Sequence, residues 1–127
     1  MFVVVIITPH LNMPITAFDI EIMNGIKEMI DKDISVHYPI GYLAEKAAMS
    51  ESRLKLLFKK IYKTGLYAYL LKQRMKRAGD LLQGGNKTLQ ETGKLTGFKY
   101  YTNFTRAFKR HFGITPGQYR RRALGDE

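Results

Sequence analysis

The fold is decided by the sequence GFKYYTNFTRAFKRHFGITPGQY, residues 97–119. Within it, Tyr100, Phe104 and Phe108 recur every four residues, which predicts one apolar stripe along a helix. The opposite arc is polar and cationic, with Thr102, Thr105, Arg106, Lys109 and Arg110. Gly97 suits a tight turn before this helix, and Thr115-Pro116 is typical of a further helix start. The stretch predicts a turn, a basic amphipathic helix and a second helix start.

The same pattern occurs once more, 50 residues earlier (104 − 54 = 50). Leu54 and Phe58 stand where the second copy has Phe104 and Phe108, and a pair of basic residues follows in both copies. A short helical segment precedes each basic helix, at 40–47 and at 89–95, and both segments contain small residues. Small residues let two helices cross closely, as a helix-turn-helix requires. The chain therefore contains a degenerate internal repeat.

Apolar spacing and capping residues together predict an all-α chain of about seven helices. The expected helices are 16–32, 40–47, 51–62, 66–83, 88–95, 100–111 and one from about 116. The first helix-turn-helix spans about 40–62, the second about 88–111, and the long helix 66–83 connects them. We expect one folded domain over 16–122, flanked by an N-terminal tail (1–15) and a C-terminal tail (123–127).

With these elements the chain resembles the DNA-binding domain of the AraC/XylS family of bacterial transcription regulators, over roughly residues 18–122. That domain consists of two helix-turn-helix units joined by a long helix. The resemblance is most specific at Gly97-Phe98, Phe104, Arg106, Phe108-Lys109, Phe112-Gly113, Thr115-Pro116 and Tyr119-Arg120. The first copy matches at Leu43-Ala44, Met49-Ser50, Leu54 and Phe58-Lys59.

The chain departs from the family pattern at three places. Lys63 stands where glycine is common, and Gly65 offers another position for that bend. Leu56 stands where arginine is frequent, and Thr92-Gly93 replaces the usual Ile-Ala. Glycine inside a helix costs about 1 kcal/mol relative to alanine, so we expect the second unit to be softer than the family norm.

Charge is unevenly distributed over the 127 residues, whose net charge is +10. Residues 1–35 carry two lysines and five acidic residues (2 − 5 = −3), whereas residues 36–127 carry 19 Lys/Arg and six acidic residues (19 − 6 = +13). The basicity thus belongs to the repeat. Such a surface attracts phosphate backbones, although charge alone would equally suit RNA, heparin-like polymers or acidic membranes.

Recognition-helix geometry together with the resemblance selects the residues expected to contact DNA. The N-terminal turns of such a helix enter the major groove on its solvent face. This implies base reading by Ser52, Arg53, Lys55, Tyr101, Thr102, Thr105 and Arg106, and phosphate contacts by Lys59, Lys60, Lys109 and Arg110. Arg106 can bind guanine O6 and N7 bidentately.

Basic residues elsewhere have other expected roles. Arg74 on the connecting helix is expected to make a structural ion pair rather than a DNA contact. For the run Arg120-Arg121-Arg122, phosphate contact and a solvated tail both remain open.

The residue inventory argues against an enzyme. There is no cysteine, and His10, His37 and His111 are scattered, so we expect no catalytic residues, metal or cofactor. The apolar run at residues 2–7 is far shorter than the roughly 20 residues that span a bilayer. We expect no membrane partner and a cytoplasmic protein, in which that run is a tail, an added strand or a contact surface.

The resulting hypothesis is a sequence-specific regulator that binds double-stranded DNA as a monomer and reads two adjacent major-groove segments. Stand-alone relatives imply RNA polymerase as a further partner, and we expect no small-molecule ligand within this chain. The 15 or so residues before the first helix cannot supply the ligand-binding or dimerisation domain of most family members, so a small stand-alone regulator and a piece of a larger one remain open.

Two alternatives remain. In one, the fold is an interaction module whose basic surface engages RNA polymerase or another acidic protein while DNA binding has weakened. In the other, a basic chain coats RNA or membranes without specificity.

Overall fold

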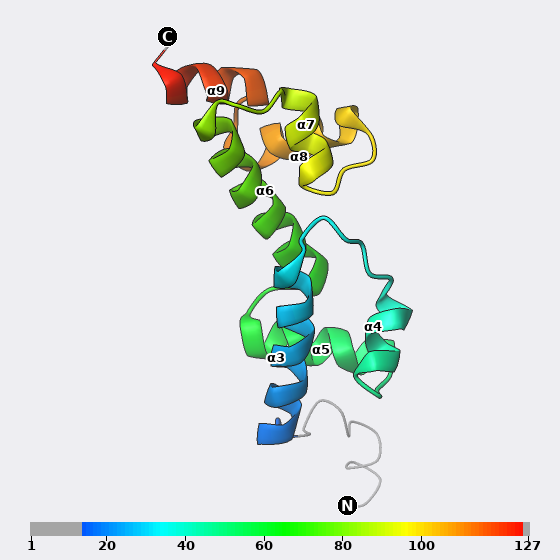
Figure 1. Cartoon of the computed structure of the whole chain (residues 1–127). Helices are drawn as coiled ribbons and strands as arrows, with labels where there is room; N and C mark the ends of the chain where they lie inside the picture. Colours follow the sequence, from blue (N-terminus) through cyan, green and yellow to red (C-terminus); the bar gives the residue numbers. More distant parts are fainter. Residues whose placement is uncertain (1–13, 126–127) are drawn as a thin grey trace, which may run out of the picture. The chain divides into compact units, whose positions relative to one another are not determined.

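The computed structural model describes residues 14–125, and all of its regular secondary structure in that range is helical (Figure 1). The helices are α3 (Ala17–Lys32), α4 (Ile40–Lys46), α5 (Glu51–Tyr62), α6 (Leu66–Gly84), α7 (Leu89–Leu95), α8 (Tyr101–Phe112) and α9 (Pro116–Leu124). Seven helices within the described residues confirm the all-α prediction. The apolar run at 2–7 and His10 lie outside the described residues, as do positions 126–127.

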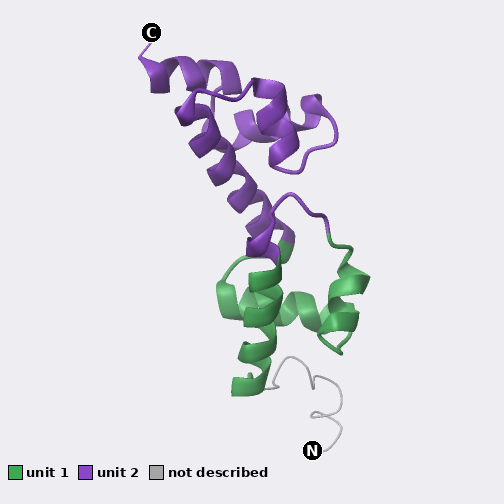
Figure 2. Cartoon of the chain, viewed as in Figure 1, with its two compact units in different colours: residues 1–29, 38–66 green, residues 30–37, 67–127 purple. Residues whose placement is uncertain are grey.

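The described chain divides into two compact units (Figure 2). The first unit comprises residues up to 29 and 38–66, which include α4, α5 and most of α3. The second unit comprises residues 30–37 and 67 onward, which include α7, α8, α9 and nearly all of α6. Each unit contains one of the predicted helix-turn-helix pairs.

The core of the first unit is mainly aliphatic and includes one buried phenylalanine. Met23 of α3, Leu43 of α4 and Leu54 and Phe58 of α5 are completely buried. Ser50 caps α5, because its hydroxyl accepts a hydrogen bond from the backbone N–H of Arg53 at 3.1 Å. These contacts confirm the predicted helix start and the predicted inward face of α5.

Helix α5 ends at Lys63, which has a left-handed backbone with φ 63°. Gly65 is not among the residues with positive φ in the described chain. The bend therefore lies at Lys63 and is not shifted to the glycine two positions later. The backbone N–H of Lys63 donates to the carbonyl of Lys59 at 2.8 Å. The hydrogen bond that closes the helix is therefore present although Lys63, unlike glycine, carries a side chain.

The second unit has an aromatic core. Met75, Ala78 and Leu82 of α6 and Phe104 and Phe108 of α8 are completely buried and form one cluster. The partly buried residues packed against it are Leu89, Phe98, Tyr101, Ala107, Phe112 and Tyr119. Because α8 turns a continuous row of rings inward, its opposite arc is left for polar and basic residues.

Small residues in α7 allow α8 to approach closely, as predicted. A Cβ atom on Gly93 would lie 3.1 Å from Cγ of Phe104. Thr92 is completely buried, and its hydroxyl donates to the carbonyl of Thr88 at 2.9 Å. Thr88 also forms a capping box with Glu91 at the start of α7. Whether the second unit is softer than the family norm stays a prediction.

The prediction that Tyr100 belongs to the apolar stripe is wrong. Tyr100 precedes α8 with an extended backbone (φ −115°, ψ 130°), and 57% of its surface is exposed. The extended backbone removes it from the helical period, so the ring of Tyr101 packs near the core instead. Helix α8 begins one residue later than expected for this reason.

The C-terminal helix begins as the sequence indicated. Thr115 and Gln118 form a capping box around Pro116, which occupies the first turn of α9. The helix continues to Leu124, two residues beyond the predicted domain end at 122. Over the residues that the structure describes, none of the helices is long and apolar enough to cross a membrane.

Candidate nucleic-acid interface

Helix α8 gathers four of the predicted DNA-contacting residues on one arc. Thr102, Arg106, Lys109 and Arg110 are exposed, whereas Phe104 and Phe108 on the opposite arc are completely buried. Thr102 and Arg106 lie four residues apart, so they are neighbours on the helix surface. A helix of 12 residues is about 18 Å long. Its cross-section fits into a major groove, which is about 12 Å wide.

The structure brings Tyr101 and Thr105 to the edge of this arc rather than to its centre. The Tyr101 ring is partly buried, with its centroid 6.1 Å from that of Phe104. The hydroxyl of Thr105 donates to the backbone carbonyl of Tyr101 at 2.8 Å. Its proton is therefore already engaged within the helix, and the methyl group and the oxygen lone pairs are what Thr105 offers a base.

Helix α5 exposes the other predicted lysines and a serine. Ser52 and Lys55 lie in the first turns, and Lys59 and Lys60 lie in the last turn, and all four are exposed. The predicted division into base-reading residues near the N-terminus and phosphate contacts farther along stays a prediction.

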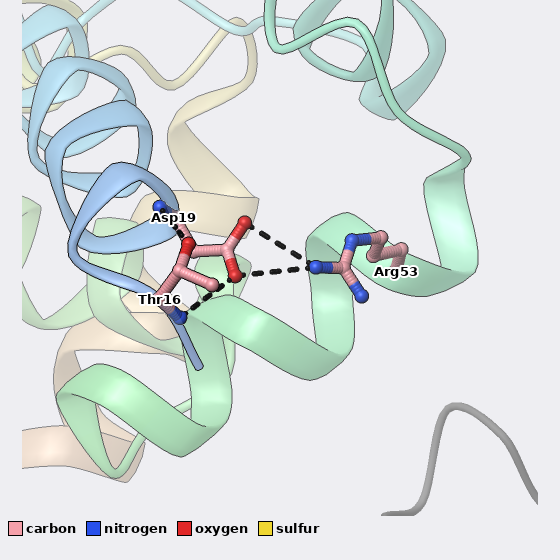
Figure 3. Close-up of polar contacts among 3 residues, drawn as sticks. All are labelled: Thr16, Asp19 and Arg53. Carbon is pink, nitrogen blue, oxygen red and sulfur yellow. Dashed lines mark hydrogen bonds and ion pairs between the residues drawn. The ribbon is translucent and has the colours of Figure 1, made fainter. Parts of the chain in front are cut away.

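Arg53, the remaining predicted base-reading residue, has a partner inside the protein. Its Nη2 lies 3.3 Å from both carboxylate oxygens of Asp19 on α3 (Figure 3). Asp19 is itself fixed at the start of α3, because it exchanges two 3.0 Å hydrogen bonds with Thr16. The N–H of Thr16 and the guanidinium of Arg53 hold the pKa of Asp19 below its usual value.

A surface hollow adjoins this ion pair on α5. It has a volume of about 300 Å³ and is lined by Ser50, Ser52, Arg53 and Leu56. Leu56 is half-buried. Leu56 was not among the predicted DNA-contacting residues. The available signal was its position four residues after Ser52, which places both on one side of the helix.

Arg74 has a structural role, but the predicted ion pair is wrong. Its Nε donates to the carbonyl of Ile34 at 2.7 Å and its Nη2 to that of Val36 at 3.5 Å. The guanidinium also lies 5.6 Å from the centroid of the Phe98 ring. Burial lowers the pKa of Arg74. Backbone carbonyls take the place of the expected carboxylate because the segment 30–37 belongs to the same unit and presents them to Arg74.

Arg120 is likewise engaged within the second unit. It donates from Nη2 to the backbone carbonyl of Lys87, which anchors the segment between α6 and α7 to α9. Arg121 and Arg122 are exposed on α9, and whether they contact phosphates stays open. Within residues 14–125, no three His, Cys, Asp or Glu side chains come together as a metal site would require.

Comparison with known proteins gives one consistent picture. A family model described as a helix-turn-helix domain matches residues 43–122. The Msm operon regulatory protein of Streptococcus mutans is 29% identical over 99 residues, which cover 78% of this chain and 36% of that protein.

Solved structures agree with that picture. A Chromobacterium violaceum transcriptional regulator with an AraC-type DNA-binding domain matches with a TM-score of 0.72 and 26% identity, over 85% of this chain and 96% of that one. The DNA-binding domain of AdpA, in complex with a target DNA, has a TM-score of 0.77 at 20% identity, over 83% and 95% of the two chains. The present chain spans about a third of the length of the first curated relatives it matches.

Proposed function

Because this chain belongs to the AraC-type helix-turn-helix family, we propose that it is a transcription regulator that binds double-stranded DNA sequence-specifically. The exposed arc of α8 carries this proposal. From its N-terminus onward, this arc presents first the proposed base-reading residues, Thr102 and Arg106. The proposed phosphate-binding cations, Lys109 and Arg110, follow them.

Each unit supplies one recognition helix, α5 or α8, for one major-groove segment. Two such segments, about one DNA turn or 10 base pairs apart, would form a bipartite, asymmetric site for a single chain. The proposed binding species is therefore a monomer. Full insertion of both helices would bend the DNA, which adds sequence dependence at base steps that the protein does not touch.

We further propose RNA polymerase as the protein partner and the cytoplasm as the place of action. A regulator seated beside a promoter changes transcription by favouring or hindering the polymerase. The exposed cations of α9 and the exposed faces of α3 lie outside the base-reading arcs and are accessible for such a contact.

The direct test is to select random double-stranded DNA against the purified chain at physiological salt and to sequence the bound pool. Two short conserved boxes about one turn apart support the bipartite reader. A single box means that only one unit reads bases. An unenriched pool contradicts the proposal and favours the interaction module.

Arg106→Ala assigns one box to α8. We expect it to relax the preference at one base pair by about 1–3 kcal/mol, the usual discrimination of a bidentate arginine–guanine contact. Arg106→Lys keeps the charge but loses the fork, so it should relax the same base pair while the salt dependence stays unchanged. Lys72→Ala is the matched control, because it removes one exposed charge from α6. An equal loss at every sequence would make Arg106 a phosphate contact.

A further inference from the structure

Arg53 of α5, which the sequence predicts to read a base, is bound to a carboxylate of the same unit. The guanidinium of Arg53 is directed at Asp19 (Figure 3), and its side chain is 27% exposed. An arginine that reads guanine needs both prongs of its fork free to face the base. In this unit one prong, Nη2, is shared between the two oxygens of Asp19.

The partner of Arg53 is fixed before any DNA arrives. Asp19 is buried, with 7% of its surface exposed, and its carboxylate accepts from the N–H of Thr16 while its own N–H donates to the Thr16 hydroxyl. A carboxylate held in this way keeps its charge and its direction. Moving Arg53 into the groove would leave that charge with one partner fewer, which is unfavourable for a buried group.

With Arg53 held to one side, the hollow beside it becomes the distinctive surface of α5. Its lining combines the hydroxyls of Ser50 and Ser52 with the apolar side chain of Leu56. Lys59 and Lys60, which are exposed on the same helix, are the cations predicted to bind phosphates. The occupant that fits is a base edge of double-stranded DNA that carries an apolar group.

Among the four bases only thymine presents a methyl group in the major groove, and apolar side chains are its usual partners. Given the proposed DNA-binding function, on which this inference rests, we propose that Arg53 is a positioning residue held by Asp19 and that the first unit reads a thymine methyl group in the hollow lined by Ser52 and Leu56. Specificity in this unit then comes from an apolar contact and not from the arginine.

Replacing thymine by deoxyuridine tests the contact, because it removes the methyl group and nothing else. Each thymine of the selected site is replaced in turn, and binding is measured by titration. We expect one position in the box read by α5 to lose about fourfold in affinity, the equivalent of about 0.8 kcal/mol for one buried carbon group. Leu56→Ala should bind weakly to both DNAs and no longer distinguish them.

Two results would overturn the contact. In one, no thymine in that box is sensitive to loss of its methyl group. In the other, Leu56→Ala keeps the full sensitivity. The substitution of the DNA is made against the unaltered protein, so the test does not depend on whether a variant folds.

Asp19→Asn tests the positioning role. Loss of the carboxylate charge frees Arg53, and we expect a new preference for guanine next to the thymine box that disappears in Asp19→Asn/Arg53→Ala. Glu28→Gln is the matched control, because it removes one exposed charge from the same helix. Identical base preferences for Asp19→Asn and Glu28→Gln would overturn the positioning role, and so would a lost base preference in Arg53→Gln alone.

Failure of the proposed function and failure of the thymine contact give different results. If the unaltered chain prefers no DNA sequence, the proposed function fails and this inference fails with it. If it keeps a bipartite preference that ignores thymine methyl groups, only this inference fails.

Discussion

The two helix-turn-helix units form the turn between their helices with different residues. Four residues, 47–50, join α4 to α5, whereas five residues, 96–100, join α7 to α8. In each turn one residue has a left-handed backbone: Ala48 with φ 54° in the first and Gly97 with φ 98° in the second. Glycine adopts this backbone without penalty and alanine does not, so the first unit stores strain that the second avoids.

The ends of the recognition helices differ in the same way. Lys63 and Gly113 occupy equivalent positions (113 − 63 = 50) and both are left-handed, with φ 63° and 80°. The first unit again places a side chain where the second has glycine. The repeat has therefore kept its backbone although its sequence has diverged, at a cost of about 1–2 kcal/mol for each such residue.

The units also differ in how polar groups hold them together. The first unit joins α3 to α5 through the ion pair of Asp19 and Arg53, which lies beside the proposed DNA-reading surface. The second joins the segment 30–37 to α6 and to the turn before α8 through Arg74, which is partly buried. The first unit thus uses a carboxylate as the partner of its arginine, whereas the second uses backbone carbonyls.

The largest expected effect is that of Gly97→Ala. A Cβ atom there would lie 2.7 Å from Cζ of Arg74 and 2.8 Å from the backbone oxygen of Ser35, in addition to the positive φ. We expect a loss of about 3 kcal/mol or more in the free energy of unfolding, measured by urea titration. Ala48→Gly, its counterpart, should be neutral or stabilising. Equal effects of the two substitutions on the free energy of unfolding would mean that the two units do not differ in the strain of their turns.

Arg74→Met should have the next largest effect. It keeps much of the side-chain volume but leaves the carbonyls of Ile34 and Val36 without this donor, which we expect to cost about 1–2 kcal/mol. Arg53→Met, which breaks the more accessible pair of the first unit, should cost less. Thermal unfolding of both variants gives the comparison, and a greater loss for Arg53→Met would reverse the proposed order.

Exchanging the residues that end the recognition helices isolates backbone strain. Lys63→Gly should stabilise the chain by about 0.5–1 kcal/mol, and Gly113→Ala should destabilise it by about 1 kcal/mol. No heavy atom lies within 4 Å of the position that a Cβ on Gly113 would take, so a clash does not contribute. The midpoints of urea unfolding measure both effects. A stabilising effect of Gly113→Ala would contradict the predicted backbone strain.

The smallest expected effect is on the pH dependence of stability. The hydrogen bond from the backbone of Thr88 lowers the pKa of Glu91 below its ordinary 4.5. A depressed folded-state pKa means that the stabilisation is complete above pH 4.5 and disappears as the pH falls through the folded-state value. The stability gap between the unaltered chain and Glu91→Gln should therefore close on acidification from pH 7 to pH 3, followed by urea midpoints. A stability gap that stays constant with pH would mean that the ionisation of Glu91 does not contribute to the stability of the cap.

Helix positions and the inward faces of α5 and α8 could be predicted from the sequence, because they follow from local rules. The apolar stripe of Phe104 and Phe108 repeats with the helical period, and Ser50, Thr88 and Thr115 are residues that cap helices through short-range hydrogen bonds. The exposure of Arg106 follows from the same period. These features require no knowledge of distant contacts.

What only the tertiary structure decided was the set of partners between distant segments. Asp19 and Arg53 are 34 residues apart, and Arg74 and Ile34 are 40 apart, so no local periodicity pairs them. For that reason the sequence predicted Arg53 as a base reader from its place on α5 and could not predict its contact with Asp19. The sequence determined which surface of each helix faces solvent, and long-range packing decided which of the cations on it were already engaged within the protein.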